Sequence, residues 1–299
     1  MKPLTIGTRG SPLALAQVVI IRGLLQKACP ALPVETKVIT TSGDNFTNLS
    51  LTAGGGKGLF TKEIEEQLLR GEIHVAVHSL KDLPTILPEG LMIGAVSPRE
   101  DVHDAFISKR FSSIQELPHN ARVATSSIRR RAQLLAKRPD LQIEEIRGNV
   151  ETRLRKLEEN DSLDALILAA AGLRRLGLWR TYGKLHWQEI DFELMIPAVG
   201  QGAIACEVRD SDTVTREAMA RVNDDNTAAC TTAERVFLQV LGGGCQVPYA
   251  AHATVEGERL RMLGATFSPD GKNVRRTEII GSKNDPRDVG ERAAEQVLK

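Results

Sequence analysis

The feature that most constrains the fold is a strand–turn–helix opening that occurs twice along the chain. The first copy runs from the apolar strand LTIGT (4–8) through RGSP into an amphipathic helix over 13–28. The second runs from RVATSS (122–127) into a helix that begins IRRRAQLL. In the first copy Ser11 is a natural N-cap, and Pro12 stands at the first helical position. The repetition predicts two similar α/β domains in tandem.

The segments after each opening continue to alternate between strand and helix patterns. Such alternation is typical of parallel sheets covered by helices. Thr61 is expected to cap the helix that follows the glycine loop at 51–60. The apolar segment IPAVGQGAIACEV (196–208) predicts a strand that returns to the first domain, which would give a double connection and a hinge. The further strands are expected at 34–43, 74–80, 91–96, 141–148 and 164–171.

The pattern changes near residue 222. NTAACTTAERVFLQVL (226–241) predicts a helix that ends at Gly242. The following segment alternates apolar and polar residues between turns, which is typical of a β-meander, and a last helix closes the chain. We therefore expect two hinged α/β domains and a small C-terminal α+β domain, with these boundaries: 1–98 together with 197–220, 99–196, and 221–299.

Composition excludes several classes of function. The 299 residues carry a formal net charge of +1 and are only 4% aromatic, so neither nucleic acid nor a membrane is expected as a partner. The four cysteines show no CxxC spacing, and no metal site is predicted. The N-terminus lacks the pattern of a signal peptide. We expect a cytoplasmic protein with free thiols, which acts as a monomer.

Basic residues gather in the loops at the predicted carboxyl ends of the strands. Residues 122–156 contain ten Lys or Arg against four acids. Ligands of open α/β sheets bind at these strand ends, so the ligand is expected to be polyanionic. GGGKGLF (54–60) lacks the spacing of a nucleotide-binding phosphate loop. An alternative, a solvated helix face, fits Arg131, Lys137, Arg138 and Arg155. The cationic residues at the strand ends are Arg9, Lys57, Lys81, Arg129, Arg130, Arg147 and Arg153. The alternative fits Arg9, Arg147 and the Arg129–Arg130 pair less well, because each stands at a strand-to-helix turn.

Two further residues stand out from this cationic pattern. Asp82, in VHSLKDLP, is an acid in a site that should attract anions, so it is a candidate to stabilise a cation or to relay protons. A simple turn residue ahead of Pro84 is the alternative. Cys245 follows three glycines in LGGGCQVP, a bare loop where a packing cysteine is unusual.

These motifs together resemble the porphobilinogen deaminase (hydroxymethylbilane synthase) family. The similarity runs from residue 4 to about 250 through GTRGSPLALAQ, GGKGLFTKEIE, VHSLKDLP, TSSIRRRAQL, IRGNVETRL, AAAGLRRLG, PAVGQGAI and GGGCQVP. The resemblance implies domains like those of type II periplasmic binding proteins. It also implies a transferase, EC 2.5.1.61, that joins four porphobilinogens with loss of ammonia and releases hydroxymethylbilane for haem biosynthesis.

The resemblance also implies roles for individual residues. Cys245 would carry a covalent dipyrromethane cofactor, and Asp82 would stabilise the cationic azafulvene and the protonated pyrrole ring. Phe60 would cover the cofactor. The cofactor carboxylates would be held by Lys81, Thr125, Ser127, Arg129, Arg130 and Arg153. The substrate or growing chain would be held by Arg9, Ser11, Arg147 and Arg175.

Two departures from the family pattern concern Gly10, where a larger polar residue is usual, and Ala53, where a lysine is frequent. Two other classes of function remain as alternatives. A non-catalytic polyanion binder would share the two-domain fold but would leave Cys245 unexplained. A thiol hydrolase would need a histidine partner for Cys245, and His252 stands in no recognisable pairing motif.

Overall fold

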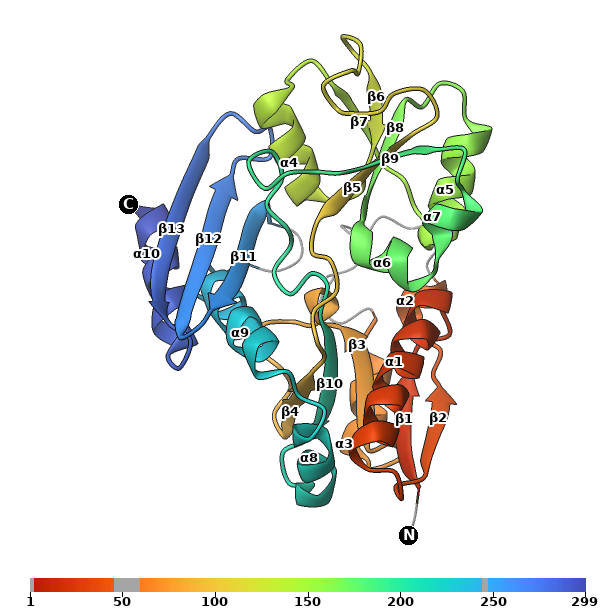
Figure 1. Cartoon of the computed structure of the whole chain (residues 1–299), viewed down its shortest axis with the longest axis vertical. Coiled ribbons are helices and arrows are strands. Elements are labelled where there is room, and N and C mark those ends of the chain that lie inside the picture. Colours follow the sequence, from red (N-terminus) through yellow and green to blue (C-terminus); the bar gives the residue numbers. More distant parts are fainter. Residues whose placement is uncertain (1–2, 46–59, 244–246) are drawn as a thin grey trace. The chain divides into compact units, whose positions relative to one another are not determined.

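The computed structural model describes residues 3–45, 60–243 and 247–299 (Figure 1). The chain divides into two compact units. Unit 1 comprises residues 1–99 and 203–228, and unit 2 comprises 100–202 and 229–299. Unit 1 contains one five-stranded sheet, whereas unit 2 contains a five-stranded sheet and a three-stranded sheet.

The sheet of unit 1 has the order β2-β1-β3-β10-β4. β1 is parallel to β2 and β3, whereas β10 runs antiparallel to both β3 and β4. The predicted return of the chain to the first domain is therefore confirmed. The expectation of a wholly parallel sheet is wrong, because the returning strand enters in the opposite direction. The strands are β1 (Leu4–Thr8), β2 (Val34–Val38), β3 (Val75–Ser79), β4 (Leu91–Val96) and β10 (Ile204–Arg209).

The first helix of unit 1, α1 (Pro12–Ala28), buries one apolar side. α1 contributes Val18, Ile21 and Leu25 to the core that also holds Val75 and Cys206. Complete burial of such aliphatic side chains contributes about 1.5–3 kcal/mol each. The helices are α1 (Pro12–Ala28), α2 (Ser42–Asn45), α3 (Lys62–Leu69), the 3₁₀ turn η1 (Leu80–Asp82) and α8 (Thr213–Ala220).

The two N-caps expected in unit 1 differ in outcome. The Ser11 hydroxyl accepts a hydrogen bond from the Ala14 backbone N–H at 3.3 Å, as predicted. Thr61 precedes α3, but its side chain makes no capping hydrogen bond. Its backbone is not in the extended conformation that N-caps usually adopt, with φ −120° and ψ −31°. The first turn of α3 carries Glu63 and Glu65, which suit the positive end of the helix dipole.

The larger sheet of unit 2 has the order β7-β6-β8-β5-β9. β6 is parallel to β7 and β8, while β5 is antiparallel to β8 and β9. β5 and β9 were not predicted. The strands are β5 (Asp104–Ser108), β6 (Arg122–Ala124), β7 (Gln142–Glu144), β8 (Ala165–Ala169) and β9 (His186–Glu189). The helices are α4 (Ile128–Lys137), α5 (Val150–Glu159), α6 (Ala170–Arg175) and α7 (Leu178–Thr181).

The C-terminal part of unit 2 is the predicted meander, β11-β12-β13, with antiparallel pairing throughout. Its core holds Phe237, Leu260 and Met262, all fully buried. Gly242 has φ +63°, the left-handed conformation expected where a helix ends in glycine. The elements are α9 (Asp225–Val240), β11 (Tyr249–Glu256), β12 (Arg259–Phe267), β13 (Val274–Ser282) and α10 (Pro286–Leu298).

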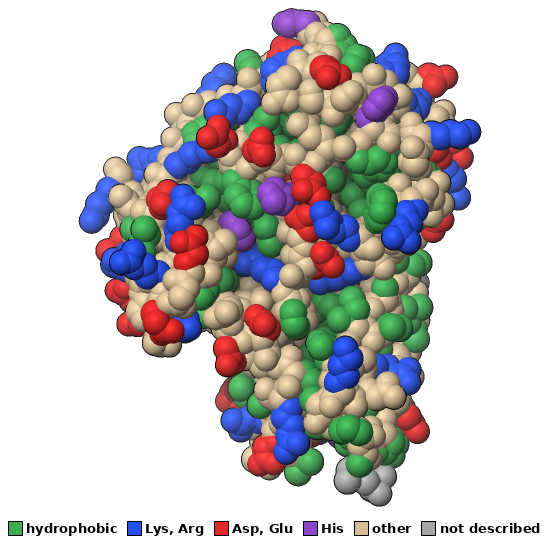
Figure 2. Space-filling view, viewed as in Figure 1, with side chains coloured by type: hydrophobic (Ala, Val, Ile, Leu, Met, Phe, Trp, Pro, Cys, Tyr) green, Lys and Arg blue, Asp and Glu red, His purple; other side chains and the backbone are tan. Residues whose placement is uncertain are grey.

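Acidic and basic side chains are interspersed over the face of the molecule seen in Figure 2. This distribution agrees with a formal net charge of +1. Within the described residues, no helix is long and apolar enough to cross a bilayer.

Candidate active site

The edge of the unit 1 sheet where β1 and β3 end carries four of the predicted site residues. Arg9 and Ser11 follow β1, and Lys81 and Asp82 lie in η1, directly after β3. β1 and β3 are parallel neighbours, so their carboxyl ends lie at one edge. We call this the carboxyl edge of unit 1. Lys81 is half-buried and Asp82 is exposed.

Two contacts fix the loops of this edge. The Gln17 side-chain amide on α1 donates a hydrogen bond to the Ser79 hydroxyl at 2.7 Å, which ties α1 to the end of β3. The Leu80 backbone N–H donates to the Ala203 carbonyl at 3.0 Å. The guanidinium of Arg9 lies 4.1 Å from the centre of the Phe60 ring, a cation–π contact. Phe60 therefore lies against the cationic loop that follows β1.

The corresponding edge of unit 2, where β6, β7 and β8 end, carries the remaining described candidates. Parallel strands β7, β6 and β8 are neighbours, so the segments that follow them share one edge. We call it the carboxyl edge of unit 2. The residues that follow these strands are Thr125, Ser127, Arg129 and Arg130 after β6, Arg147 and Arg153 after β7, and Arg175 after β8.

The turn between β6 and α4 is held by its own hydroxyl groups. The Thr125 hydroxyl accepts a hydrogen bond from the Ser127 N–H at 3.2 Å. The Ser127 side chain caps α4 by accepting from the Arg130 N–H at 3.4 Å. The two polar residues thus shape the helix start that presents Arg129 and Arg130.

Arg129 and Arg130 are both buried, and both pair with Asp104, the first residue of β5. Nη2 of Arg129 lies 2.7 Å from Asp104 Oδ2, and Nη2 of Arg130 lies 2.7 Å from Oδ1. Burial alone would raise the pKa of Asp104, but the two guanidinium groups outweigh it and hold that pKa well below its ordinary value. Burial lowers the pKa of Arg129, and Asp104 opposes this.

Gln201 completes this group. Its amide nitrogen lies 3.0 Å from Asp104 Oδ1 and donates to the Val102 carbonyl at 2.8 Å. Gln201 is fully buried. We call Asp104, Arg129, Arg130 and Gln201 the Asp104 cluster.

Arg175 lies at the C-terminus of α6 and is half-buried. Nη2 donates a hydrogen bond to the Gly202 carbonyl at 2.6 Å, while the buried Nε has no hydrogen-bond partner among the described residues. Burial lowers the pKa of Arg175, and Glu100 opposes this shift. Gly202 has φ +85°, and a Cβ there would lie 2.3 Å from the Glu100 carbonyl oxygen, so glycine is required.

Arg147 and Arg153 flank the start of α5 and are both half-buried. Nε of Arg153 donates to the Gly148 carbonyl at 2.8 Å. Nη2 of Arg147 lies 3.3 Å from Glu145 Oε2, which is an exposed ion pair. Ion pairs of this kind at the protein surface contribute only about 0–1 kcal/mol.

Cys245 lies outside the described residues, as do Ala53 and Lys57. Of the other three cysteines, two are buried and one lies at a helix end. Burial raises the pKa of the Cys206 thiol to about 12. Cys230 is buried, and Cys29 is the C-cap residue of α1.

Sequence reasoning did not identify Asp104, Gln201 or Gln17 as contributors to these edges. Each is a polar residue that is almost completely buried. The signal was present for Asp104, since an acid directly before the apolar run AFI is unusual unless it is paired. Its partners are at least 25 positions away in the sequence, so the pairing itself could not be derived.

Two other polar groups of unit 2 contain no predicted site residue. Asp101, His103 and Glu189 lie close enough to share an ion, but the Arg174 guanidinium pairs with both carboxylates. A cavity of about 250 Å³ lies beside α5 and is lined by Ala124, Glu144, Glu145, Ile146, Lys156, Glu159, Asn160 and Leu163. Its three glutamates disfavour an anionic ligand.

The fold and the arginines at these sheet edges define a class of α/β protein whose site is suited to an anionic ligand. Comparison with known proteins specifies the class further. Residues 4–217 match the family model described as porphobilinogen deaminase, dipyromethane cofactor binding domain, and residues 228–299 match the porphobilinogen deaminase C-terminal domain. The chain belongs to the porphobilinogen deaminase family.

Full-length relatives agree with this assignment. The chain is 49% identical to the porphobilinogen deaminase of Pelobacter propionicus, over 99% of this chain and 94% of that protein. It is 50% identical to that of Trichlorobacter lovleyi, over 99% and 93% of the two chains. The chain is thus a porphobilinogen deaminase, EC 2.5.1.61, an enzyme of tetrapyrrole biosynthesis with a dipyrromethane cofactor domain. The non-catalytic binder and the thiol hydrolase are excluded as its main function.

Solved structures show more distant similarity. An ancestral arginine-binding protein bound to arginine has a TM-score of 0.42 at 15% identity, over 74% of this chain and 91% of that one. A probable amino-acid ABC transporter extracellular-binding protein from Bacillus subtilis has a TM-score of 0.44 at 13% identity, over 76% and 94%. Neither value supports a functional argument.

Proposed function

We propose that Cys245 carries the dipyrromethane cofactor through a thioether, and that four porphobilinogens are added to it in succession before hydroxymethylbilane is released. The observation that carries this proposal is the excess of guanidinium groups at the carboxyl edge of unit 2. There, Arg129 and Arg130 share a single carboxylate, and the buried Nε of Arg175 has no hydrogen-bond partner within the part of the chain that the structure describes. Such groups favour a ligand that brings its own carboxylates.

The cationic residues at the carboxyl edges of the two units fit the cofactor. Its acetate and propionate groups are planar carboxylates, which arginine forks bind through two parallel hydrogen bonds. The cofactor supplies a covalently held primer to which the pyrrole chain is attached. We assign its carboxylates to Lys81, Thr125, Ser127, Arg129, Arg130 and Arg153. We assign the carboxylates of the substrate and growing chain to Arg9, Ser11, Arg147 and Arg175, with Phe60 covering the cofactor.

Asp82 is proposed as the catalytic acid–base group. When porphobilinogen loses ammonia, the remaining methylene–pyrrole carries a positive charge, and the pyrrole that it joins must later lose a proton. A carboxylate is the side chain suited to both demands, since it stabilises the cation and accepts hydrogen bonds from pyrrole N–H groups. Asp82 lies in η1, immediately after a buried strand, on a turn fixed by the Leu80–Ala203 backbone hydrogen bond.

The chemistry of the other thiols supports Cys245 as the attachment residue. The thiolate is the nucleophilic form of cysteine, so a thiol with a raised pKa reacts poorly. Burial raises the pKa of Cys206 to about 12, and Cys230 is also buried. A thioether requires a reduced thiol, which supports a cytoplasmic location.

We also propose that the enzyme acts as a monomer with the three-domain division 1–98 with 197–220, 99–196, and 221–299.

Mass spectrometry of the intact protein tests the attachment. The purified enzyme should be heavier than its sequence by one dipyrromethane, and peptide mapping should place the addition on Cys245. Cys245→Ala should lack both the added mass and activity. The matched controls Cys29→Ala, Cys206→Ala and Cys230→Ala should retain the addition. Attachment to any other cysteine, or activity without Cys245, would overturn the proposal.

Asp82→Asn tests the catalytic role separately. The variant should fold and carry the cofactor but consume porphobilinogen at least about 100-fold more slowly, which corresponds to about 2.7 kcal/mol. Asp210→Asn is the control, since Asp210 is another exposed acid of unit 1. If the rate of Asp82→Asn stayed within a few-fold of the parent rate, Asp82 would have only a structural role in its turn.

A further inference from the structure

The Asp104 cluster contains more positive charge than it neutralises. Two guanidinium groups face one carboxylate, and within the described part of the chain neither arginine pairs with a second acid. Asp104 is 0% exposed, Arg129 is 5% exposed and Arg130 is 7% exposed. Since the pKa of Asp104 is held low, its carboxylate is ionised and the group has a net charge of +1. A buried net charge is unfavourable unless an anion joins it.

The geometry uses only part of the hydrogen-bonding capacity of the two arginines. A guanidinium has five N–H donors, so the pair offers ten. Arg130 donates hydrogen bonds from Nε and Nη2 to Asp104 Oδ1, and from Nη1 to the Ile167 carbonyl. Arg129 donates Nη1 to the Ile196 carbonyl, and its Nη2 lies 2.7 Å from Asp104 Oδ2 in an ion pair. These five contacts orient both planar groups and leave other donors for a ligand.

The carboxylate itself is held in place from several sides. Asp104 begins β5 and is paired in register with Ala169, the last residue of β8, so it lies at the carboxyl edge of unit 2. The Gln201 amide contacts the same carboxylate and a neighbouring backbone carbonyl. A fixed carboxylate of this kind can set the position of the guanidinium groups to within a few tenths of an ångström.

We propose that Asp104 is a positioning residue for the enzyme: its carboxylate orients Arg129 and Arg130 together and leaves the pair with one unit of positive charge for a cofactor carboxylate. This inference rests on the proposed function, which assigns both arginines to the cofactor. It adds a requirement for the length of the acidic side chain as well as for its charge. Asp104 touches neither substrate nor cofactor in this proposal and acts only through the arginines.

Two substitutions separate charge from position. Asp104→Glu keeps the negative charge but moves the carboxylate by one methylene, so the guanidinium groups of both arginines shift. Asp104→Asn keeps the shape but removes the charge. Asp140→Asn is the matched control, because Asp140 pairs with Arg138 near the other end of α4. The primary readout is the fraction of folded protein that carries the added dipyrromethane mass, measured on the monodisperse fraction after size-exclusion chromatography.

The fraction of folded Asp104→Glu molecules that carry the added mass should be at least ten-fold lower than the fraction in the parent. Asp140→Asn should load fully. For Asp104→Glu molecules that do load, kcat should fall while KM for porphobilinogen stays within about two-fold, since the substrate is assigned to other arginines. Asp104→Asn combined with Arg129→Leu should lose less loading than the sum of the two single losses, because both changes remove the Arg129–Asp104 contact.

A purely structural Asp104 would give a different pattern. Asp104→Glu would then lower the melting temperature while its folded molecules loaded as fully as the parent, and this result would overturn the inference. An additive loss in the double variant would also overturn it. If the parent enzyme itself lacks an addition on Cys245, the proposed function fails instead. The two failures are therefore distinguishable.

Discussion

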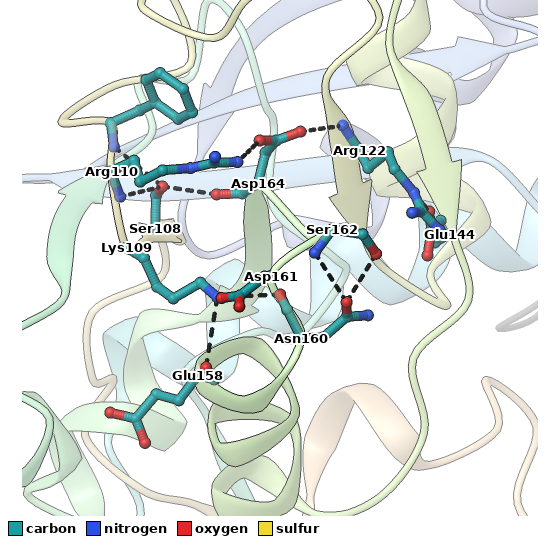
Figure 3. A network of polar contacts seen from close by, with 11 residues as sticks. Ser108, Lys109, Arg110, Arg122, Glu144, Glu158, Asn160, Asp161, Ser162 and Asp164 are labelled. Carbon is teal, nitrogen blue, oxygen red and sulfur yellow. Dashed lines mark hydrogen bonds and ion pairs between the residues drawn. The ribbon is translucent and has the colours of Figure 1, made fainter.

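The two edges of the larger sheet in unit 2 differ in how their cations are paired with acids. At the edge where β6 and β8 begin, which we call the amino edge, each cation meets its own acid (Figure 3). Arg110 pairs with Asp164 and Lys109 with Asp161, while Arg122, the first residue of β6, pairs with Glu144 on the neighbouring strand β7. At the carboxyl edge, two arginines share Asp104.

The two edges also differ in exposure to solvent. The Arg110 and Arg122 side chains of the amino edge are 54% and 40% exposed, and Asp161 is completely exposed. Matched, solvated pairs contribute about 0–1 kcal/mol each and need no ligand. Buried, unmatched charges cost free energy until an anion arrives. The number of arginines therefore identifies the binding edge less well than the ratio of buried cations to acids.

The largest difference between the edges should appear in Arg130→Leu. This variant should purify without the covalent addition and lose at least about 100-fold in activity, because it removes a buried cofactor contact. Arg131→Leu is the matched control on the same helix, where the side chain is exposed. Intact mass and porphobilinogen consumption are measured for both. Equal loading of the two variants would contradict the assignment.

Arg175→Leu should have the next largest effect. We expect the variant to carry the cofactor but to stall at partial chain lengths, with kcat lowered about 10-fold, because a substrate carboxylate loses its partner. Arg174→Leu removes the adjacent exposed arginine and should elongate normally. Mass spectra after addition of substrate give the distribution of chain lengths. Identical distributions for the two variants would remove the proposed division between cofactor and substrate arginines.

Asp164→Asn probes the amino edge. Asp164 pairs with Arg110 and accepts a hydrogen bond from the Arg122 backbone N–H at 2.7 Å, and its side chain is 12% exposed. The substitution should cost about 1–3 kcal/mol in the free energy of unfolding, since it weakens a buried acceptor. Urea denaturation measures this cost, while cofactor loading and kcat should be unchanged. Lost loading would mean that the amino edge also serves the ligand.

The smallest effect is expected for Lys109→Ala. Lys109 lies 2.9 Å from the fully exposed Asp161 and also donates to the Asn160 carbonyl at 3.1 Å. Its removal should lower the free energy of unfolding by less than about 1 kcal/mol, and added salt should shrink the difference. Denaturation at low and high ionic strength checks this, and a larger loss at high salt would contradict it.

The fold was predictable where its signals are local. The Ser11 cap, the helix that ends before Gly242 and the meander all follow from residues adjacent in sequence, and the structure agrees. The return of β10 was also visible, because a long apolar run followed the second α/β pattern. β5 and β9 were missed because each is short and lies between irregular segments, so its identity depends on pairing with distant strands.

The candidate site shows the same limit. Cationic residues after strands were visible in the sequence, but the pairing of Arg129 and Arg130 with Asp104 depends on β5 lying beside β8. Asp82 and Cys245 remain predictions, since their roles depend on a ligand. Residue types thus indicated the ligand's charge, whereas the folded chain was needed to find what orients the residues.

The placement of β10 between β3 and β4 affects how the chain folds while it is being synthesised. β4 ends at Val96 and joins the sheet through β10, which begins at Ile204. At about 5–20 residues per second, a ribosome needs roughly 5–20 s to translate residues 97–203. During that interval the facing edges of β3 and β4 lack their native partner, and unpaired edges are templates for wrong pairing. The nascent chain therefore depends most on chaperones before β10 has emerged.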